Sequence, residues 1–263
     1  MSIKVLVTGA NGQLGKTIEE LYSKNNLAID FKFVTKTDLD ITKKNDIESI
    51  FKNNNFHYCI NCAAYTNVEQ AERKPEIAYK VNSEAVKYLA EACKKSHTVL
   101  IHISTDYVFD GEKGEPYTIN DIPNPINEYG KSKLLGEQYI QGILNEYFIV
   151  RTSWLYSKKY GRNFYRTIKA LAEEKKELSV TTKEIGCPTN TETLARSVVG
   201  LISNKSMIYG IKHISDGDVM TWYDFAELIL SENNLIHKTN LLKGKNYVTF
   251  ARRPKYSVLL NSE

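Results

Sequence analysis

The stretch VLVTGANGQLG, Val5 to Gly15, decides the fold of this 263-residue chain. An apolar run typical of a buried strand ends in three glycines spaced three residues apart, Gly9, Gly12 and Gly15, and an amphipathic pattern follows. A strand, a glycine-rich turn and a helix in this order form a dinucleotide-binding fingerprint. Gly9 permits the tight turn, Gly12 lets the backbone approach a pyrophosphate, and Gly15 lets helix and strand pack closely. A simple turn is the alternative, but the position between strand and helix favours nucleotide binding.

Short apolar runs alternate with amphipathic segments along the first 150 residues. We expect strands at 3–8, 31–35, 57–64, 98–105 and 147–153, and helices near 14–24, 43–53, 75–96 and 127–145. Strands that are apolar on both faces and separated by helices predict a parallel sheet covered on both sides. Beyond Trp154 we expect helices near 161–175, 190–203 and 221–234, and strands near 178–181 and 207–214.

These patterns predict an α/β protein with a Rossmann-type doubly wound parallel sheet and a smaller C-terminal substrate-binding lobe. The NAD(P)-binding domain is expected over residues 1–153, and the lobe, interleaved with it, over 154–263. The segment 106–126 is too proline-rich and too long for an ordinary connection. Since it follows an expected strand, we predict a functional loop there.

Composition bounds the class of protein. Hydrophobic residues make up 42% of the chain, which is enough to bury a large core. The 35 Lys and Arg residues exceed the 31 Asp and Glu residues only slightly and are spread along the chain, so we expect no nucleic-acid partner. No apolar run approaches the roughly 20 residues that span a bilayer, and no signal-peptide pattern precedes the first strand. We therefore expect a cytoplasmic protein without a membrane partner.

Cys59 and Cys62 form a C-x-x-C pair, which elsewhere marks a redox or zinc site. No second pair accompanies it, and strand alternation sends the two side chains to opposite faces. We therefore predict buried structural thiols and no metal site.

The end of the second expected strand is where a dinucleotide's adenosine ribose would lie. An acidic residue there selects NAD, whereas a cation pairs with the 2′-phosphate of NADP. Lys36 occupies this point, which favours NADPH, with NADH as the alternative if this lysine is only a solvated surface residue.

Tyr129 and Lys133 form a Y-x-x-x-K pattern at the start of an expected helix, one turn apart on the same face. A neighbouring ammonium favours the ionised form of a phenol, so we expect a lowered pKa that makes Tyr129 a general acid or base. An exposed helix pair is the alternative. Ser104 and Thr105 end the fourth expected strand and point to opposite faces, so only one hydroxyl can meet the tyrosine.

Together these segments resemble the extended short-chain dehydrogenase/reductases, and more closely the dTDP-4-dehydrorhamnose reductase family. The matching pieces are GANGQLG, DLDIT, NCAAYTNVEQAE, STDYVFDG, YGKSKLLGE, RTSWLY, RNF, GCPT and RRP. STDYVF combined with RTSWLY is the most specific part of this resemblance. One segment, TNVEQAE, departs from the usual AVDKAE at Asn67 and Glu69.

The resemblance implies hydride transfer from NAD(P)H to C4 of dTDP-4-dehydro-L-rhamnose, giving dTDP-L-rhamnose. Tyr129 would donate the proton, Lys133 would hold the nicotinamide ribose and lower the pKa of the tyrosine, and Thr105 would hydrogen-bond the C4 oxygen.

The resemblance also carries binding residues over to this chain. The implied cofactor contacts are Asn11, Gly12, Gln13 and Leu14 at the pyrophosphate, Asp40 and Ile41 at the adenine, and Cys62, Ala63, Ala64 and Tyr65 at the nicotinamide half, with Asn82 as a lesser candidate. The implied substrate contacts are Asp106 and Trp154 near the hexose, and Asn163 and Arg253 at the dTDP end. Trp154 has a core aromatic as its alternative role, and Arg252 and Lys255 compete with Arg253 for the diphosphate.

Other functions remain open at this stage. The same motifs suit a reductase of another 4-keto nucleotide sugar, or a non-catalytic binding protein such as the regulatory subunit of methionine adenosyltransferase. The intact Thr105, Tyr129 and Lys133 argue against the non-catalytic reading. An epimerase or dehydratase with tightly held NAD is disfavoured because STDYVF and RTSW follow the reductase branch. A homodimer through the helices near 75–96 and 127–145 is an expectation from relatives.

Overall fold

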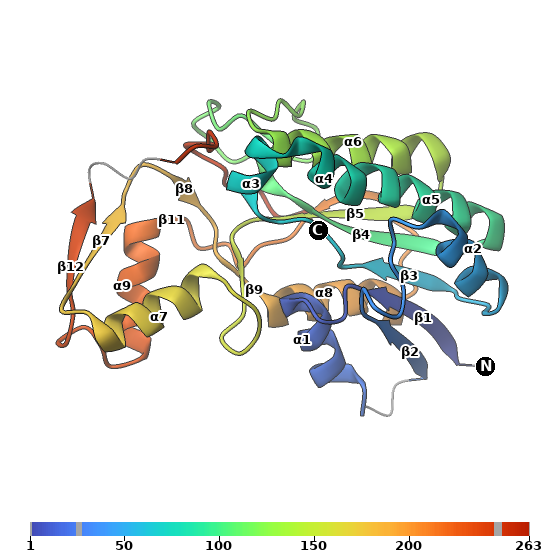
Figure 1. The fold of residues 1–263 in the computed structure, drawn as a ribbon, viewed down its shortest axis with the longest axis horizontal. Coiled ribbons are helices and arrows are strands. Elements are labelled where there is room, and N and C mark those ends of the chain that lie inside the picture. Colours follow the sequence, from blue (N-terminus) through green and yellow to red (C-terminus); the bar gives the residue numbers. More distant parts are fainter. Residues whose placement is uncertain (1, 25–27, 245–248, 263) are drawn as a thin grey trace.

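A six-stranded parallel sheet forms the centre of the protein (Figure 1). The computed structural model describes residues 2–24, 28–244 and 249–262. The sheet has the order β2-β1-β3-β4-β5-β10, and every neighbouring pair is parallel. Its strands are β1 (Ile3–Thr8), β2 (Ile29–Val34), β3 (Tyr58–Asn61), β4 (Val99–Thr105), β5 (Tyr147–Thr152) and β10 (Gly210–His213). The predicted doubly wound parallel sheet is confirmed, with its topological switch point between β1 and β3.

Helices cover both faces of this sheet, and on each face a separate apolar core lies between the helices and the sheet. On one face lie α2 (Lys44–Lys52), α5 (Ala85–Ser96) and α6 (Glu128–Ile143); on the other lie α1 (Gln13–Tyr22) and α8 (Thr191–Ser203). Cys59 belongs to the first core and Cys62 packs against the second, so the two thiols do lie on opposite faces. All four cysteines are free thiols.

The expected helix near 75–96 is continuous but not uniform. It consists of α4 (Pro75–Tyr79), a π-helical turn η1 (Lys80–Glu84) and α5, and α3 (Val68–Arg73) precedes it. Among the described residues, no helix is both long and apolar enough to cross a membrane.

A smaller group of elements stands beside the sheet and has a core of its own (Figure 1). It contains α7 (Phe164–Glu174), α9 (Trp222–Glu232) and the strand pairs β7 (Glu177–Thr181) with β12 (Asn240–Gly244), β8 (Ile185–Gly186) with β11 (Met220–Thr221), and β6 (Leu155–Tyr156) with β9 (Thr189–Asn190). We call this group the lobe. Because α8 and β10 also come from residues after 154 yet join the sheet, the two parts are interleaved, and the division at 153 remains a prediction.

Candidate active site

The glycine turn sits at the switch point between β1 and β3. Gly9 has a φ of +66°, and a Cβ there would lie 2.6 Å from the backbone nitrogen of Ala63. A Cβ on Gly15 would lie 2.7 Å from the carbonyl oxygen of Gly9. α1 begins directly after Gly12, which supplies no side-chain cap to the first N–H groups of the helix. A close backbone approach and uncapped donors at a helix N-terminus suit a diphosphate, so these residues fit a dinucleotide.

The turn after β2 exposes a lysine side chain, and its two carboxylates are engaged in local hydrogen bonds. The backbone N–H and the hydroxyl of Thr35 both donate to the Asp38 carboxylate, at 2.8 and 2.6 Å. Asp40 likewise accepts from the N–H and hydroxyl of Thr42, at 3.0 and 2.8 Å. Lys36 is exposed, whereas Ile41 is buried. Since the carboxylates are held in local turns, a positively charged partner for a 2′-phosphate fits this end better than an acceptor for a 2′-hydroxyl.

A cavity of about 480 Å³ joins the glycine turn to the lobe. From the residues predicted to form the site, its wall contains Gly12, Gln13, Leu14, Cys62, Ala64, Thr105, Asp106, Tyr129, Lys133, Trp154 and Arg253. The predicted residues outside this wall are Gly9, Asn11, Gly15, Lys36, Asp40, Ile41, Ala63, Tyr65, Asn82 and Asn163. The cavity therefore brings together the expected catalytic residues with parts of both expected binding regions.

Tyr129 lies in the first turn of α6, which the Asn127 side chain caps by accepting a hydrogen bond from the Gly130 N–H at 2.8 Å. The side chain of Thr105, at the end of β4, lies close enough to the phenol to influence its pKa, and both residues line the cavity. Ser104 instead turns to the other face of β4, where its hydroxyl donates to Glu137. Thr105 is therefore the hydroxyl that meets the tyrosine.

The pKa of Tyr129 is raised to about 12, above its ordinary value, chiefly because the phenol is buried. The charge of Asp106 raises it further, while the Thr105 side chain opposes the shift. This direction is opposite to the lowering expected from the Y-x-x-x-K spacing. Burial of the phenol outweighs the expected lowering of the pKa. The Lys133 amine is engaged on β4, where Nζ donates to the Ile103 carbonyl oxygen at 2.6 Å and lies 3.1 Å from His102 Nε2.

Asp106 is a buried carboxyl group beside the reacting pair. Its two oxygens accept from the hydroxyls of Thr105 and Ser153, each at 3.0 Å. Burial nevertheless raises its pKa to about 6, with the hydrogen bonds of Ser257, Ser153 and Thr105 acting in the opposite direction. A carboxyl group that titrates near neutral pH thus adjoins the hydroxyl that meets Tyr129.

Trp154 forms the wall opposite the glycine turn. Its backbone φ is +45°, and its indole ring stacks on Trp222 of α9 with the ring centroids 3.5 Å apart and the planes 5° from parallel. A Cβ on Gly186 would lie 2.6 Å from the Trp154 ring, so the indole fits only against a glycine. Trp154 therefore packs within the fold and also lines the cavity, while its contact with the hexose remains a prediction.

Two predicted asparagines have their amides engaged within the fold. The Asn82 side chain accepts from the Tyr65 N–H at 2.8 Å and donates to the Tyr65 carbonyl and the Ser132 hydroxyl. The Asn163 amide nitrogen lies within hydrogen-bonding distance of Gln13 Oε1 (3.1 Å) and two backbone carbonyls, and its oxygen caps α7. Both residues hold cavity segments in place, and their direct ligand contacts remain predictions.

Arg253 reaches the cavity from the C-terminal segment and pairs with an acid on α3. Its Nη2 donates to Glu69 Oε1 at 3.1 Å, while Glu69 Oε2 accepts from the backbone N–H groups of Phe250 and Ala251 at 2.8 and 3.3 Å. Glu69 is one of the departures from the family pattern, and it ties down the segment that carries Arg253.

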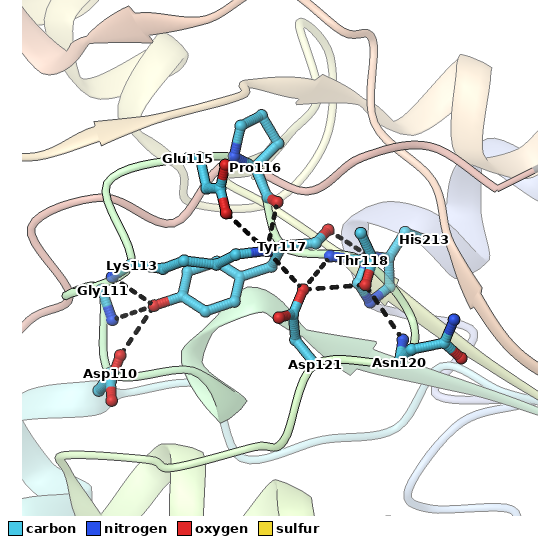
Figure 2. A network of polar contacts seen from close by, with 10 residues as sticks. All are labelled: Asp110, Gly111, Lys113, Glu115, Pro116, Tyr117, Thr118, Asn120, Asp121 and His213. Atoms are coloured by element: carbon cyan, nitrogen blue, oxygen red, sulfur yellow. Dashed lines mark hydrogen bonds and ion pairs between the residues drawn. The ribbon is translucent and has the colours of Figure 1, made fainter.

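The long loop after β4 is fixed by polar contacts (Figure 2). The Tyr117 hydroxyl accepts from the Gly111 N–H at 3.0 Å and donates to Asp110 at 2.8 Å. The backbone carbonyl oxygen of Tyr117 lies 3.0 Å from Nδ1 of His213 on β10. Only Asp106 and Tyr107, at the start of the loop, line the cavity. The part of this loop that borders the cavity is therefore its first turn, and a functional role for the loop remains a prediction.

Several wall residues were not predicted from the sequence. They are Thr66, Val68, Ile103, Ser104, Tyr107, Thr152, Leu155, Gly161, Arg162 and Trp222. Tyr107 adjoins Thr105 within STDYVF and could have been included on that ground. Trp222 lies 68 positions after Trp154 and carries no local signal.

Comparison with known proteins agrees with this geometry. A family model described as RmlD substrate binding domain matches residues 3–263. The dTDP-4-dehydrorhamnose reductase of Aggregatibacter actinomycetemcomitans is 37% identical, with 97% of this chain and 90% of that protein covered. The chain belongs to the dTDP-4-dehydrorhamnose reductase family.

Two further similar proteins bear on ligands. A crystal structure of dTDP-4-dehydrorhamnose reductase from Bacillus anthracis in complex with NADP matches with a TM-score of 0.94 and 40% identity, covering 100% of this chain and 92% of that one. A protein of Streptomyces niveus named dTDP-4-keto-6-deoxy-D-glucose reductase is 35% identical over 87% of this chain and 78% of its own length.

Proposed function

We propose that this protein is an NADPH-dependent oxidoreductase that reduces the C4 keto group of dTDP-4-dehydro-L-rhamnose to give dTDP-L-rhamnose. The observation that supports it most is the single cavity that joins the glycine turn to Thr105, Tyr129 and Lys133. Family membership and the names of the relatives support the same substrate class.

The residues of the cavity suit a carbonyl reduction. When bound, NADPH supplies the hydride. Tyr129 holds its proton at neutral pH, because its pKa lies near 12, and an alkoxide is a stronger base than a phenolate. Tyr129 therefore donates its proton to the substrate oxygen, and the Thr105 hydroxyl, which donates to Asp106 in this structure, would turn to donate to the same oxygen. Lys133 contacts the nicotinamide ribose, and its ammonium form assists the proton transfer.

The proposed cofactor is NADPH, with NADH as a weaker competitor. Lys36 follows β2 and is exposed, and the acids nearby are held by Thr35 and Thr42. The similar reductase of Bacillus anthracis was crystallised with NADP. The affinity ratio for the two cofactors, measured by fluorescence titration, tests this choice.

Turnover is tested by the loss of NADPH absorbance with dTDP-4-dehydro-L-rhamnose as substrate. Tyr129→Phe should lower kcat by a factor of at least about 100 and leave cofactor affinity intact, because only the proton donor is lost. Tyr79→Phe is the matched control, since that hydroxyl donates to Glu128 outside the cavity wall and its removal should leave kcat unchanged. Full turnover by Tyr129→Phe would remove Tyr129 as the acid, and a folded wild-type protein that binds NADPH without turnover would indicate a binding protein.

A second candidate substrate is another 4-keto nucleotide sugar, because a similar protein is named dTDP-4-keto-6-deoxy-D-glucose reductase. The same assay with both sugars decides between them. The higher kcat/KM identifies the substrate for which the lobe is built.

The proposed setting is the cytoplasm, with no nucleic-acid or membrane partner. A homodimer through α5 and α6 belongs to the same proposal. Sedimentation analysis tests the oligomeric state, and a monomer at all concentrations would refute this part alone.

A further inference from the structure

A chain of buried polar side chains runs beneath the cavity from β1 through β3 and β4 to α6. The Thr8 hydroxyl donates to Asn61 Oδ1 at 2.7 Å, Asn61 Nδ2 lies 3.0 Å from His102 Nδ1, and His102 Nε2 lies 3.1 Å from Lys133 Nζ. None of these four residues is more than 1% exposed. Buried polar groups of this kind need compatible donors and acceptors, so their protons can be placed one after another.

The orientation of the Asn61 amide decides whether His102 Nδ1 carries a proton. The backbone N–H of Ala63 donates to Asn61 Oδ1 at 3.2 Å, and a backbone N–H has no acceptor role. The atom it meets must therefore be the amide oxygen. Nδ2, which only donates, then faces His102 Nδ1, so Nδ1 must accept and carries no proton.

The second proton follows from the first. An imidazole without a proton on Nδ1 is neutral and carries its proton on Nε2, the nitrogen that faces Lys133. An imidazolium is excluded because its Nδ1–H would meet the amide donor, and burial together with Lys133 lowers the pKa of His102 well below its usual value. An Nε2–H needs an acceptor, and Lys133 offers one only as a neutral amine, whose lone pair an ammonium lacks.

We propose that His102 is a positioning residue for Lys133: its Nε2–H, fixed by the Asn61 amide, hydrogen-bonds the lone pair of the Lys133 amine and makes the ammonium form harder to reach. The other Lys133 contact, to the Ile103 carbonyl oxygen, is available to both forms and does not discriminate between them. This inference rests on the proposed function, since the reaction uses the ammonium form of Lys133.

The other influences on Lys133 act in both directions: burial, the largest, lowers its pKa and disfavours the ammonium, whereas the charge of Glu137 favours it. Glu137, on the same helix, is paired with Arg151 from β5 through contacts of 2.7 to 3.2 Å, so its charge is largely neutralised. Cys62, after β3, is a neutral thiol because burial raises its pKa. Tyr129, one turn earlier on α6, is a neutral phenol. Burial and the contact with His102 therefore both disfavour the ammonium, and only the contact depends on which ring nitrogen of His102 carries the proton.

Asn61→Asp tests this directly, because a carboxylate has the same shape as the amide but accepts where the amide nitrogen donates. The donor and acceptor roles along the buried hydrogen bonds are then reversed. Its outer oxygen accepts from His102 Nδ1–H, which leaves Nε2 as an acceptor for the Lys133 ammonium. We expect the ¹⁵N spectrum of the His102 ring to change from the Nε2–H to the Nδ1–H pattern. The alkaline limb of the kcat profile should move up by roughly one pH unit or more.

Thr8→Val is the control, since it removes a donor to the same amide oxygen while the Ala63 N–H still fixes the amide. The Thr8→Val variant should keep the wild-type tautomer of His102, and the alkaline limb of its kcat profile should lie at the wild-type pH. A wild-type His102 protonated on Nδ1 would overturn the inference, even if Asn61→Asp did not fold. A limb that stays in place when the tautomer changes would also overturn it. The tautomer is measured without turnover, so failure of the proposed activity would be recognised separately.

Discussion

The two sides of the cavity are built in different ways. On the glycine-turn side, backbone meets backbone: Gly9 and Gly15 are positions where a Cβ would collide with main-chain atoms. On the other side, called the lobe side here and including α3 and the C-terminal segment as well as the lobe, side chain meets side chain, through the stack of Trp154 on Trp222 and the ion pair of Arg253 with Glu69. The first side cannot change without moving the sheet, whereas the second can be altered by single side chains. Cofactor binding should therefore be sensitive to backbone changes, and substrate choice to the lobe.

Gly9→Ala should have the largest effect. A Cβ 2.6 Å from the Ala63 nitrogen, at a φ of +66°, forces β1 and β3 apart or strains the turn by about 1–3 kcal/mol. We expect cofactor affinity to fall by roughly tenfold to a hundredfold, as measured by fluorescence titration with NADPH.

Gly200→Ala is the matched control. Gly200 lies within α8, and an added Cβ there has no neighbour within 4 Å. This change should raise the free energy of unfolding by about 0.5–1 kcal/mol and leave cofactor affinity unchanged. Equal affinity losses in both variants would show that the turn has no special part in binding.

The same difference explains what the sequence could predict. The sheet, the glycine turn, Tyr129 and Lys133 follow from local patterns, because each depends on one strand end or one helix turn. The choice of Thr105 over Ser104 came from the family resemblance. Trp222 and the Glu69–Arg253 pair depend on segments distant in the chain, so no spacing rule could indicate them. The predicted lowering of the Tyr129 pKa was wrong, because the phenol is buried and burial raises the pKa, which the Y-x-x-x-K spacing does not indicate.

Trp222→Ala should have an intermediate effect, confined to the substrate. Stacked aromatic pairs contribute about 0.5–1.5 kcal/mol beyond their buried area, and Trp154 at φ +45° loses this support. We expect KM for the sugar nucleotide to rise roughly threefold to tenfold while NADPH affinity is unchanged. Trp222→Phe keeps part of the stack, so its KM should lie between those of the wild type and Trp222→Ala. An equal loss of NADPH affinity would contradict the separation of the two sides.

Glu69→Gln should have the smallest effect, and it should lower KM where Trp222→Ala raises it. The glutamine oxygen can still accept from the Phe250 N–H, but its amide group no longer holds Arg253 by charge. Partly exposed ion pairs contribute about 0.2–1 kcal/mol, so an Arg253 released toward the substrate diphosphate should lower KM by up to roughly fivefold.

Glu112→Gln provides the comparison that isolates this contact. Glu112 pairs with Lys255, two residues after Arg253, at 3.6 Å, and both side chains are largely exposed. Its replacement makes the same change in net charge beside the segment that carries Arg253, without removing a partner of Arg253 itself. If both variants lower KM equally, the effect comes from the general potential of the segment, and Arg253 is not the diphosphate ligand. If only Glu69→Gln does so, and added salt weakens the gain, the arginine on the lobe side binds the substrate directly.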